Sequence, residues 1–217
     1  MIFSLFSVYP ILIFPWLAVI LISITVHEFS HAFAAYKLGD ATAERGGRLS
    51  LNPMDHIDWL GFVSLLILGF GWAKPVPFNP YNLSNPRWDS VKIALAGPLS
   101  NLILAIISAI IWRILAGLGI LAEAGLLNFF LFWMVLVNLF LLFFNLIPVD
   151  PLDGSKLANA LLIKPEHQKI RVFLLAYGSR ILLILIFISI LMDINVFAFI
   201  SKPSYLVCSW LLGGSCY

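Results

Sequence analysis

The stretch IFPWLAVILISITVHEFSH, residues 13–31, decides how the rest of this sequence is interpreted. The part before His27 is almost wholly apolar, and such a run predicts a helix within a membrane. Ionisable side chains inside such a helix by default mark a functional site. The HExxH spacing of HEFSH places His27 and His31 on one helix face, where they can bind one zinc while Glu28 acts as a general base. The alternative is a pair of helix histidines satisfied by hydrogen bonds alone.

Composition places the whole chain in a membrane. Of its 217 residues, 61% are hydrophobic and 11% are charged, and the mean hydropathy is +1.00, whereas soluble domains carry about 25% charged residues. We expect one membrane-embedded domain over residues 1–217, because a chain of this length fits one compact helix bundle. The net charge of +2 is small and the basic residues are scattered, which argues against a nucleic-acid partner.

The order of apolar and polar segments predicts an all-α polytopic membrane protein, a bundle of about 4 to 6 transmembrane helices. We expect helices over residues 11–36, 91–112 and 126–147. A fourth helix covers either residues 172–192, which would bury Arg180, or residues 181–200, which would leave Arg180 at an interface.

Three segments between the first two of these helices are predicted not to cross the bilayer. The alternation of residues 48–51 predicts a small β element near HEFSH. Residues 59–72 are apolar but short and broken by glycine, which predicts a re-entrant or interfacial hairpin covered by protein or by a water-filled cavity. The three prolines of AKPVPFNP, residues 73–80, exclude a helix and predict an extended surface segment.

Lys and Arg are divided unequally between the two sides that these helices create. One side holds ten and the other holds two, with Arg180 undecided. The ten are Lys37, Arg45, Arg48, Lys74, Arg87, Lys92, Lys156, Lys164, Lys169 and Arg171, and the two are Arg113 and Lys202. Basic residues accumulate on the cytoplasmic side of membrane proteins. We therefore expect a multi-pass cell-membrane protein with its N-terminus outside and HEFSH toward the cytoplasmic side.

A catalytic zinc needs a third protein ligand and an open position. Asp150 and Asp153 are candidates because they lie where the third helix returns to the side and depth of HEFSH. Gly154, without a side chain, would let the chain beside Asp153 approach a metal closely. The alternative for Asp153 and Gly154 is a turn or the N-cap of a helix that begins at Ser155.

Taken in order, these motifs resemble the site-2 protease family of intramembrane zinc metalloproteases. The resemblance spans residues 27–157 and rests on HEFSH, Gly39 with Asp40, GRLSLNP, His56 with Ile57 and Asp58, AKPVPFNP, AGPLSN and NLIPVDPLDG. It implies one zinc per chain, held by His27, His31 and Asp153. It also implies that Glu28 is the catalytic base and that Asn145, which opens the last motif, stabilises the transition state.

Several side chains keep more than one interpretation. Asp150 stands where the family usually has a proline; we favour a turn residue facing water over a competing ligand or an added charge near the metal. From the residues alone, Asn145 is an oxyanion donor or an interhelical hydrogen-bonding residue, and for Asn138 we favour the interhelical bond. Asn101 matches a family position of less clear role. His56 either supports the metal ligands or caps a turn.

The resemblance implies hydrolysis of a peptide bond within or near a transmembrane helix of a membrane-protein substrate, in a lipid bilayer. The chain shows no PDZ or nucleotide-binding segment, so it resembles the minimal form of the family. The alternatives are a membrane-bound zinc hydrolase with a non-peptide substrate and a catalytically silent zinc-binding protein. A transporter is disfavoured because no internal repeat is visible. Cys208 and Cys216 form a tail disulfide or are two apolar residues, and we favour the second.

Overall fold

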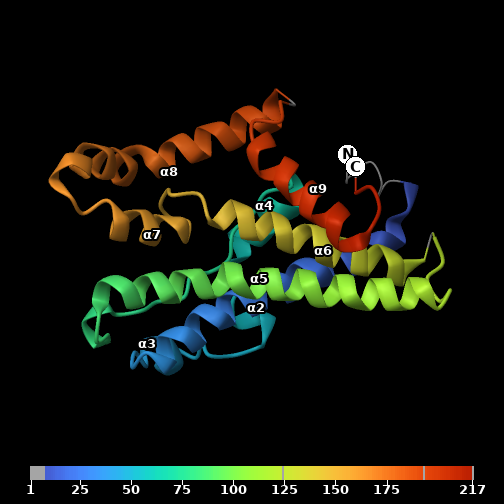
Figure 1. Cartoon of the computed structure of the whole chain (residues 1–217), viewed down its shortest axis with the longest axis horizontal. Helices are drawn as coiled ribbons and strands as arrows, with labels where there is room; N and C mark the ends of the chain where they lie inside the picture. Colours follow the sequence, from blue (N-terminus) through green and yellow to red (C-terminus); the bar gives the residue numbers. More distant parts are fainter. Residues whose placement is uncertain (1–7, 124, 193, 217) are drawn as a thin grey trace.

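The computed structural model describes residues 8–123, 125–192 and 194–216, which form a bundle of α-helices (Figure 1). Four helical segments in these ranges are long and apolar enough to cross a membrane. They are Pro10–Lys37, Pro86–Gly117, Leu126–Asn145 and Pro165–Leu191. The prediction of an all-α polytopic bundle is therefore confirmed.

The helix that carries HEFSH is α2, Ile13–Lys37, which a 3₁₀ turn at Pro10–Leu12 precedes. The predicted helix over residues 11–36 agrees with these bounds to within two residues. The helix stops where the sequence offers a glycine: the φ of Gly39 is +100°, a conformation that glycine adopts without strain. The short helix α3, Thr42–Arg45, follows.

The prediction of a strand at residues 48–51 was wrong, because none of these residues lies in a strand. The guanidinium of Arg48 instead donates to the carbonyls of Lys74 and Pro75, so a buried side chain joins this loop to the proline-rich segment. The β-type pairing within the described residues is one isolated antiparallel bridge between Ile57 and Ala73. The alternation of polar and apolar residues at positions 48–51 therefore belongs to a loop, which the hydrogen bonds of Arg48 hold in place.

The apolar segment of residues 59–72 forms a helix and a return, as predicted for a hairpin. Helix α4, Trp59–Leu68, ends at Gly69, whose φ of +74° turns the chain back. The returning arm passes so close that a Cβ on Gly61 would lie 2.2 Å from the carbonyl oxygen of Trp72. Glycine is needed at position 61 because any side chain would separate the two arms.

Residues 74–79 lie outside helices and strands and are exposed or half-buried, in line with the prediction of a non-helical surface segment. A 3₁₀ turn at Pro80–Asn82 ends it. The carboxylate of Asp40 accepts hydrogen bonds from the backbone nitrogen of Asn79 at 2.6 Å and from the amide nitrogen of Asn82 at 2.7 Å. This carboxylate therefore fixes the extended segment to the end of α2.

Helix α5, Pro86–Gly117, lies between α2 and α6, Leu126–Asn145, and packs extensively against both (Figure 1). The side chain of Asn85 caps α5 by accepting from the backbone nitrogen of Trp88. Helix α5 is longer than the helix predicted over residues 91–112. Its first turns are polar, so they lack the apolar pattern by which a membrane-spanning helix is predicted. Helix α6 ends two residues before the predicted boundary at 147.

The last third of the chain contains α7, Gly154–Leu161, α8, Gln168–Leu191, and α9, Ala198–Leu212. Helix α8 matches the bounds of the first of the two alternatives for the fourth span, but Arg180 is exposed rather than buried. The hydroxyl of Ser179 donates to the carbonyl of Asp150, so Arg180 lies level with the polar loop that follows α6. The sequence did not predict α9.

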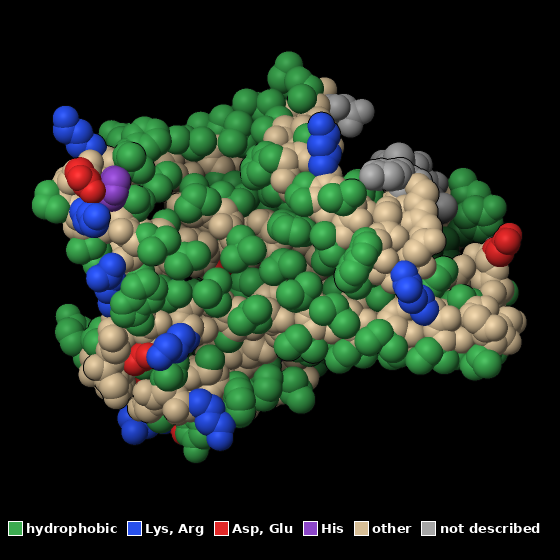
Figure 2. Space-filling model, in the orientation of Figure 1, with side chains coloured by type: hydrophobic (Ala, Val, Ile, Leu, Met, Phe, Trp, Pro, Cys, Tyr) green, Lys and Arg blue, Asp and Glu red, His purple; other side chains and the backbone are tan. Residues whose placement is uncertain are grey.

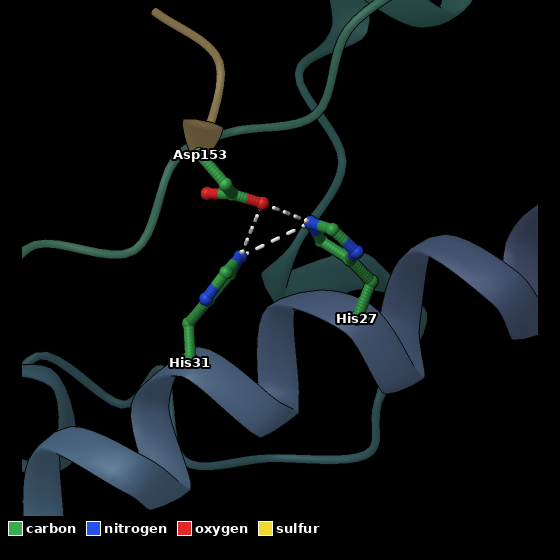
Figure 3. A group of neighbouring side chains, drawn as sticks. All are labelled: His27, His31 and Asp153. Carbon is green, nitrogen blue, oxygen red and sulfur yellow. Dashed lines mark hydrogen bonds and ion pairs between the residues drawn. The ribbon is translucent and has the colours of Figure 1, made fainter. Parts of the chain in front are cut away.

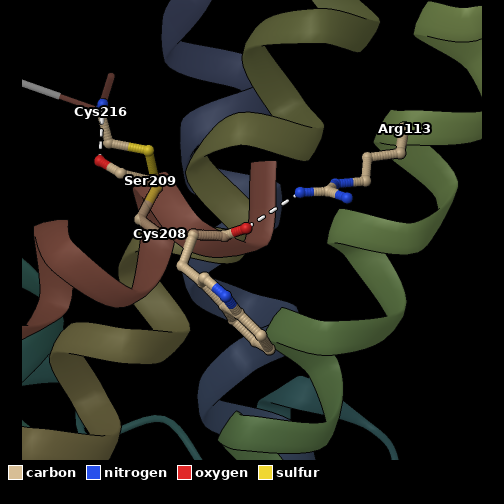
Figure 4. Close-up of a disulfide and its surroundings, with 5 residues drawn as sticks. Arg113, Cys208, Ser209 and Cys216 are labelled. Carbon is tan, nitrogen blue, oxygen red and sulfur yellow. Dashed lines mark hydrogen bonds between the residues drawn. A yellow bond between two sulfur atoms is a disulfide. The ribbon is translucent and has the colours of Figure 1, made fainter. Parts of the chain in front are cut away.

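Cys208 and Cys216 form a disulfide, so the favoured prediction of two separate apolar residues was wrong (Figure 4). Both residues are buried in an apolar cluster that α5, α6 and α9 share. The guanidinium of Arg113, near the end of α5, donates to the carbonyl of Trp210 at 2.9 Å, and Figure 4 shows this contact beside the disulfide. The tail is thus fixed to the end of the bundle opposite the C-terminus of α2.

The surface has the pattern expected of a protein in a bilayer. On the face that Figure 2 shows, most charged side chains lie at the two ends of the molecule, and hydrophobic side chains cover the region between them. The exposed residues of α5 and α8 include many large aliphatic side chains. Such an apolar surface is favourable in contact with lipid and unfavourable in contact with water.

Candidate metal centre

Three side chains from distant parts of the sequence meet inside the bundle (Figure 3). His27 and His31 come from α2, and Asp153 comes from the residue before α7. The two imidazole Nε2 atoms are 3.0 Å apart, and Asp153 Oδ2 lies 3.2 Å from the first and 3.3 Å from the second. The sequence placed all three residues at one depth, and the structure brings their polar atoms together.

The Nδ1 atom of each histidine has a partner that accepts a hydrogen bond. His31 Nδ1 lies 2.7 Å from the carbonyl oxygen of Ile93, and a carbonyl can only accept. His27 Nδ1 lies 2.6 Å from Asn101 Oδ1, which likewise accepts. The proton of each neutral imidazole is therefore on Nδ1, and each Nε2 carries a lone pair directed toward Asp153.

These three acceptor atoms have a composition and spacing that fit a metal. Asp153 Oδ2 is buried and has no hydrogen-bond donor, although it is within ion-pair distance of both rings. A proton on one Nε2 would satisfy only two of the three atoms, whereas one cation satisfies all of them. Ligand atoms about 2.0 Å from a tetrahedral zinc are roughly 3.3 Å apart, which matches the observed separations. The residues present therefore fit zinc.

The chain around Asp153 is shaped for this contact. Asp153 is at the N-cap position of α7, but its side chain makes no capping hydrogen bond and its carboxylate faces the imidazoles. A Cβ on Gly154 would lie 2.3 Å from the carbonyl oxygen of Leu146 and 2.5 Å from that of Ile147. Glycine at 154 thus lets α7 begin directly against the end of α6, and the interpretation of Asp153 as a simple cap does not describe the structure.

One face of α5 forms the other side of the centre. Ile93, Gly97 and Asn101 recur every four residues, so they lie on one helix face. A Cβ on Gly97 would lie 2.4 Å from His31 Nε2 and 2.6 Å from His27 Cε1. Gly97 is therefore required for both rings to reach their positions. Sequence reasoning missed this residue, although a glycine inside an apolar helix was visible in AGPLSN.

Of the other two predicted catalytic residues, Glu28 lies in the last third of α2 and Asn145 at the end of α6. Glu28 is 9% exposed and follows His27 directly on α2. Asn145 is the last residue of α6 and is half-buried; its amide nitrogen donates to the carbonyl of Leu141 at 3.0 Å. Within the described residues, Asn145 makes no hydrogen bond to the three clustered side chains.

The structure resolves the alternatives for Asp150. Its carboxylate is 44% exposed and lies 3.6 Å from the ammonium of Lys156. Its peptide bond to Pro151 is cis. The favoured interpretation, a turn residue that faces water, is confirmed, and Asp150 does not join the cluster.

His56 supports a loop and does not contact the cluster. Its ring is fully buried; Nε2 lies 2.7 Å from the carbonyl oxygen of Ser50 and Nδ1 lies 3.5 Å from a guanidinium nitrogen of Arg48. Burial lowers the pKa of Arg48, and the negative charges of Glu28 and Asp55 oppose this shift. Arginine stays charged even so. Arg48 therefore places a buried positive charge in the electrostatic range of Glu28.

A cavity of about 460 Å³ lies within the bundle, and none of its lining residues belongs to the His27, His31 and Asp153 cluster. Its walls come from α2, α4, the returning arm at residues 69–73, α6, α8 and the start of α9. Leu21 and Ile24 of α2 line it, and these residues precede Glu28 by two turns and one turn on the same helix face. The lining is predominantly apolar, so the cavity suits apolar side chains next to the face that bears Glu28.

Comparison with known proteins assigns the chain to a family. The family model of peptidase family M50 matches residues 15–121 and 111–189. The chain belongs to this family. A Bacillus subtilis protein named "Putative zinc metalloprotease YwhC" is 42% identical over 185 residues, which cover 83% of this chain and 84% of that protein. The protein is thus a metalloprotease with several apolar helices long enough to span a membrane, and the resemblance to site-2 proteases is confirmed.

More distant relatives carry similar names. "Putative zinc metalloprotease Rip2" of Mycolicibacterium smegmatis is 28% identical over 200 residues, 84% of this chain and 69% of that protein. "Putative zinc metalloprotease MJ0611" of Methanocaldococcus jannaschii is 32% identical over 130 residues, 60% of this chain and 61% of that protein. No solved structure matches this M50 protein significantly.

Proposed function

We propose that this M50 protease binds one zinc per chain and hydrolyses a peptide bond within or near a transmembrane helix of a membrane-protein substrate. The observation that carries the proposal is the convergence of three acceptor atoms from His27, His31 and Asp153 inside an apolar helix bundle. A protease with its metal ligands at this location meets substrates that are themselves embedded in lipid.

The chain's own residues have distinct roles in this proposal. His27, His31 and Asp153 hold the metal, and zinc in such a site supplies Lewis acidity that polarises a carbonyl and acidifies water. Glu28 accepts a proton from the attacking water and returns it to the leaving amine nitrogen. Asn145 donates from its amide nitrogen to the oxyanion that develops on the scissile carbonyl, a contribution of about 3 to 4 kcal/mol in comparable sites.

The cavity supports a substrate of apolar sequence. A helix in lipid has its backbone groups hydrogen-bonded internally, so its peptide bonds become accessible only after local unwinding. Apolar walls from α4, α6 and α8 would receive the side chains of the unwound segment. Phe144, which directly precedes Asn145, lines this cavity, and this supports a position of the proposed oxyanion donor close to it.

Two independent features support an orientation with the centre toward the cytoplasm and the N-terminus outside. The first is the excess of Lys and Arg on the side of α3 and α7. The second is the Cys208–Cys216 disulfide, which lies at the opposite end of the bundle beside Arg113. Disulfides persist in oxidising compartments and are rare in the cytosol.

The test uses the purified full-length chain loaded with zinc and a panel of transmembrane peptides in detergent or vesicles. Wild type is expected to cut at least one peptide, and Glu28→Gln is expected to keep zinc and lose cleavage. Glu44→Gln, in the short helix α3, is the matched control and should cut normally. If wild type cuts no helix but hydrolyses another bond, the protein is a zinc hydrolase of a different substrate class.

A further inference from the structure

A chain of hydrogen-bonded side chains extends from His27 to the middle of the bundle. Asn101 Oδ1 lies 2.6 Å from His27 Nδ1, and Asn101 Nδ2 donates to Asn138 Oδ1 at 2.7 Å. Asn138 Nδ2 in turn donates to Ser23 Oγ at 2.8 Å. Asn101, Asn138 and Ser23 are each 0% exposed. The chain joins α5, α6 and α2, and no step of the proposed reaction uses Asn138 or Ser23.

The direction of this chain is fixed at its far end by a backbone carbonyl. Asn138 Nδ2 also donates to the carbonyl oxygen of Met134 at 2.8 Å. A carbonyl cannot donate, so the NH₂ group of Asn138 must face Met134 and its Oδ1 must face Asn101. Asn101 then turns its NH₂ group to Asn138 and its Oδ1 to His27. The carbonyl of Met134 thus fixes the orientation of the Asn138 amide, which fixes that of Asn101, which in turn presents an acceptor to the His27 imidazole.

We propose that Asn138 is a positioning residue that acts through Asn101 to keep the proton of His27 on Nδ1 and the lone pair on Nε2. The inference rests on the proposed zinc site, because only an unprotonated Nε2 can bind a metal. Asn101 is the direct hydrogen-bond partner of His27, and such partners fix the tautomer and ring orientation of a ligand. Asn138 acts one hydrogen bond further out, by fixing the orientation of the Asn101 amide. The predicted interhelical hydrogen bond of Asn138 is present. Because Asn138 is the acceptor in its bond with Asn101, we assign it this additional role.

The two histidines differ in how their tautomers are held. The acceptor for His31 is the backbone carbonyl of Ile93, which no side-chain substitution can reverse. The acceptor for His27 is an amide that can rotate by 180°. Apart from Asn138, the NH₂ group of Asn101 has only a long contact of 3.5 Å to the backbone carbonyl of Ser23. Without Asn138, this long contact alone opposes rotation of Asn101, and a rotated Asn101 would direct its NH₂ group at His27 and require the proton of that ring on Nε2. Removal of Asn138 should therefore affect His27 and leave His31 unchanged.

The experiment compares the full-length protein with Asn138→Leu, which removes both polar groups. Zinc affinity is measured by competition with a chelator, and the imidazole tautomers of the zinc-free protein are read from ¹⁵N chemical shifts. We expect zinc binding to weaken by about 10- to 100-fold. We also expect the His27 signals to change from Nδ1-protonated to a mixture, with those of His31 unaltered.

Asn128→Leu is the matched control. Asn128 is also on α6, and its amide accepts from Trp112 Nε1 at 2.7 Å and donates to the carbonyl of Glu123 at 3.0 Å. Its removal costs the helix a similar set of hydrogen bonds without touching the chain to His27, so zinc affinity should not change. Asn138→Asp keeps an oxygen that accepts from Asn101 and should restore most of the affinity.

An Asn138→Leu protein with lower thermal stability but wild-type zinc affinity and an unchanged His27 tautomer would overturn the proposal, since Asn138 would then only join helices. If this variant does not fold, Asn138→Ala is judged by the same two measurements. The outcome is separable from the protease assignment, because tautomers and zinc affinity are measured without a substrate. A wild type that binds zinc and cuts no peptide would contradict the proposed function alone.

Discussion

Helices α5 and α8 are both long and apolar, yet they contribute to the centre in opposite ways. Helix α5 packs against α2 and α6 and presents Ile93, Gly97 and Asn101 to the two imidazoles. The buried residues of α8 are only Gly178, Leu182 and Ile186, and its contribution near the centre is a wall of the cavity. The geometry of the three clustered side chains therefore depends on α5, whereas the apolar cavity is bounded in part by a helix with few buried contacts, which favours local motion.

The strongest test of this comparison is Gly97→Ala on α5. The new Cβ would lie within 2.6 Å of atoms in both imidazoles, so at least one ring must leave its position. We expect zinc content to fall below detection and cleavage to fall by about 100-fold or more, because a displaced ligand affects both binding and geometry. Metal analysis of the purified protein and the peptide cleavage assay measure these losses.

Gly117→Ala is the matched control for that variant. Gly117 is in the last turn of the same helix, and a Cβ there meets nothing within 4 Å. Normal zinc content and cleavage are expected for Gly117→Ala. Equal losses in both variants would show that α5 tolerates no substitution for reasons unrelated to the rings.

A smaller effect is expected from Ile186→Ala on α8. Ile186 is 6% exposed and lines the cavity, so the substitution removes apolar contact with substrate and leaves the ligands in place. We expect unchanged zinc content and a KM for apolar peptides that rises by about tenfold, in line with the loss of methylene contacts in a pocket. Leu183→Ala, at an exposed position of α8, should leave KM unchanged. A loss of zinc from Ile186→Ala would contradict the separation between the two helices.

The smallest effect on cleavage is expected from Asp40, which joins α2 to the segment before α5. Burial would raise the pKa of Asp40, but hydrogen bonds from Thr42, Asn82 and Asn79 outweigh it and hold the pKa below the ordinary 3.8. A lowered pKa stabilises the fold above pH 3.8, and this stability is lost as the pH falls through the folded-state pKa.

Asp40→Asn should therefore lower the unfolding free energy by about 2 kcal/mol at neutral pH, the usual scale for hydrogen bonds to a charged group. It should also reduce the dependence of stability on pH below about 4. Thermal unfolding between pH 3 and 7 measures both changes. An Asp40→Asn protein with the same acid sensitivity as wild type would exclude Asp40 as its source.

Part of the candidate site could be predicted because it depends on residues that are close together in the sequence. The HExxH spacing places His27 and His31 on one face whatever surrounds them. The return of a span of predictable length brings Asp150 and Asp153 to the same side, and the helix bounds follow from apolar runs. The choice of Asp153 over Asp150 rested on the resemblance to site-2 proteases.

The parts that could not be predicted depend on neighbours that are remote in sequence. The importance of Gly97 is visible only once α5 lies against the imidazoles, and the direction of Asn138 depends on Asn101 from another helix. The alternation at residues 48–51 was mistaken for a strand because a buried Arg48 ties the loop to Lys74. Helix α9 carries Lys202 and Pro203 within its apolar sequence, which weakened the pattern of a helix.

The centre is also a constraint on biosynthesis. Its ligands stand at positions 27, 31 and 153, and the side chains that orient the first of them stand at 101 and 138. A chain emerging from the ribosome therefore inserts HEFSH early and keeps it incomplete until the segment after α6 has been made. Any activity of the centre therefore has to wait until α2, α5, α6 and the residue before α7 have packed together.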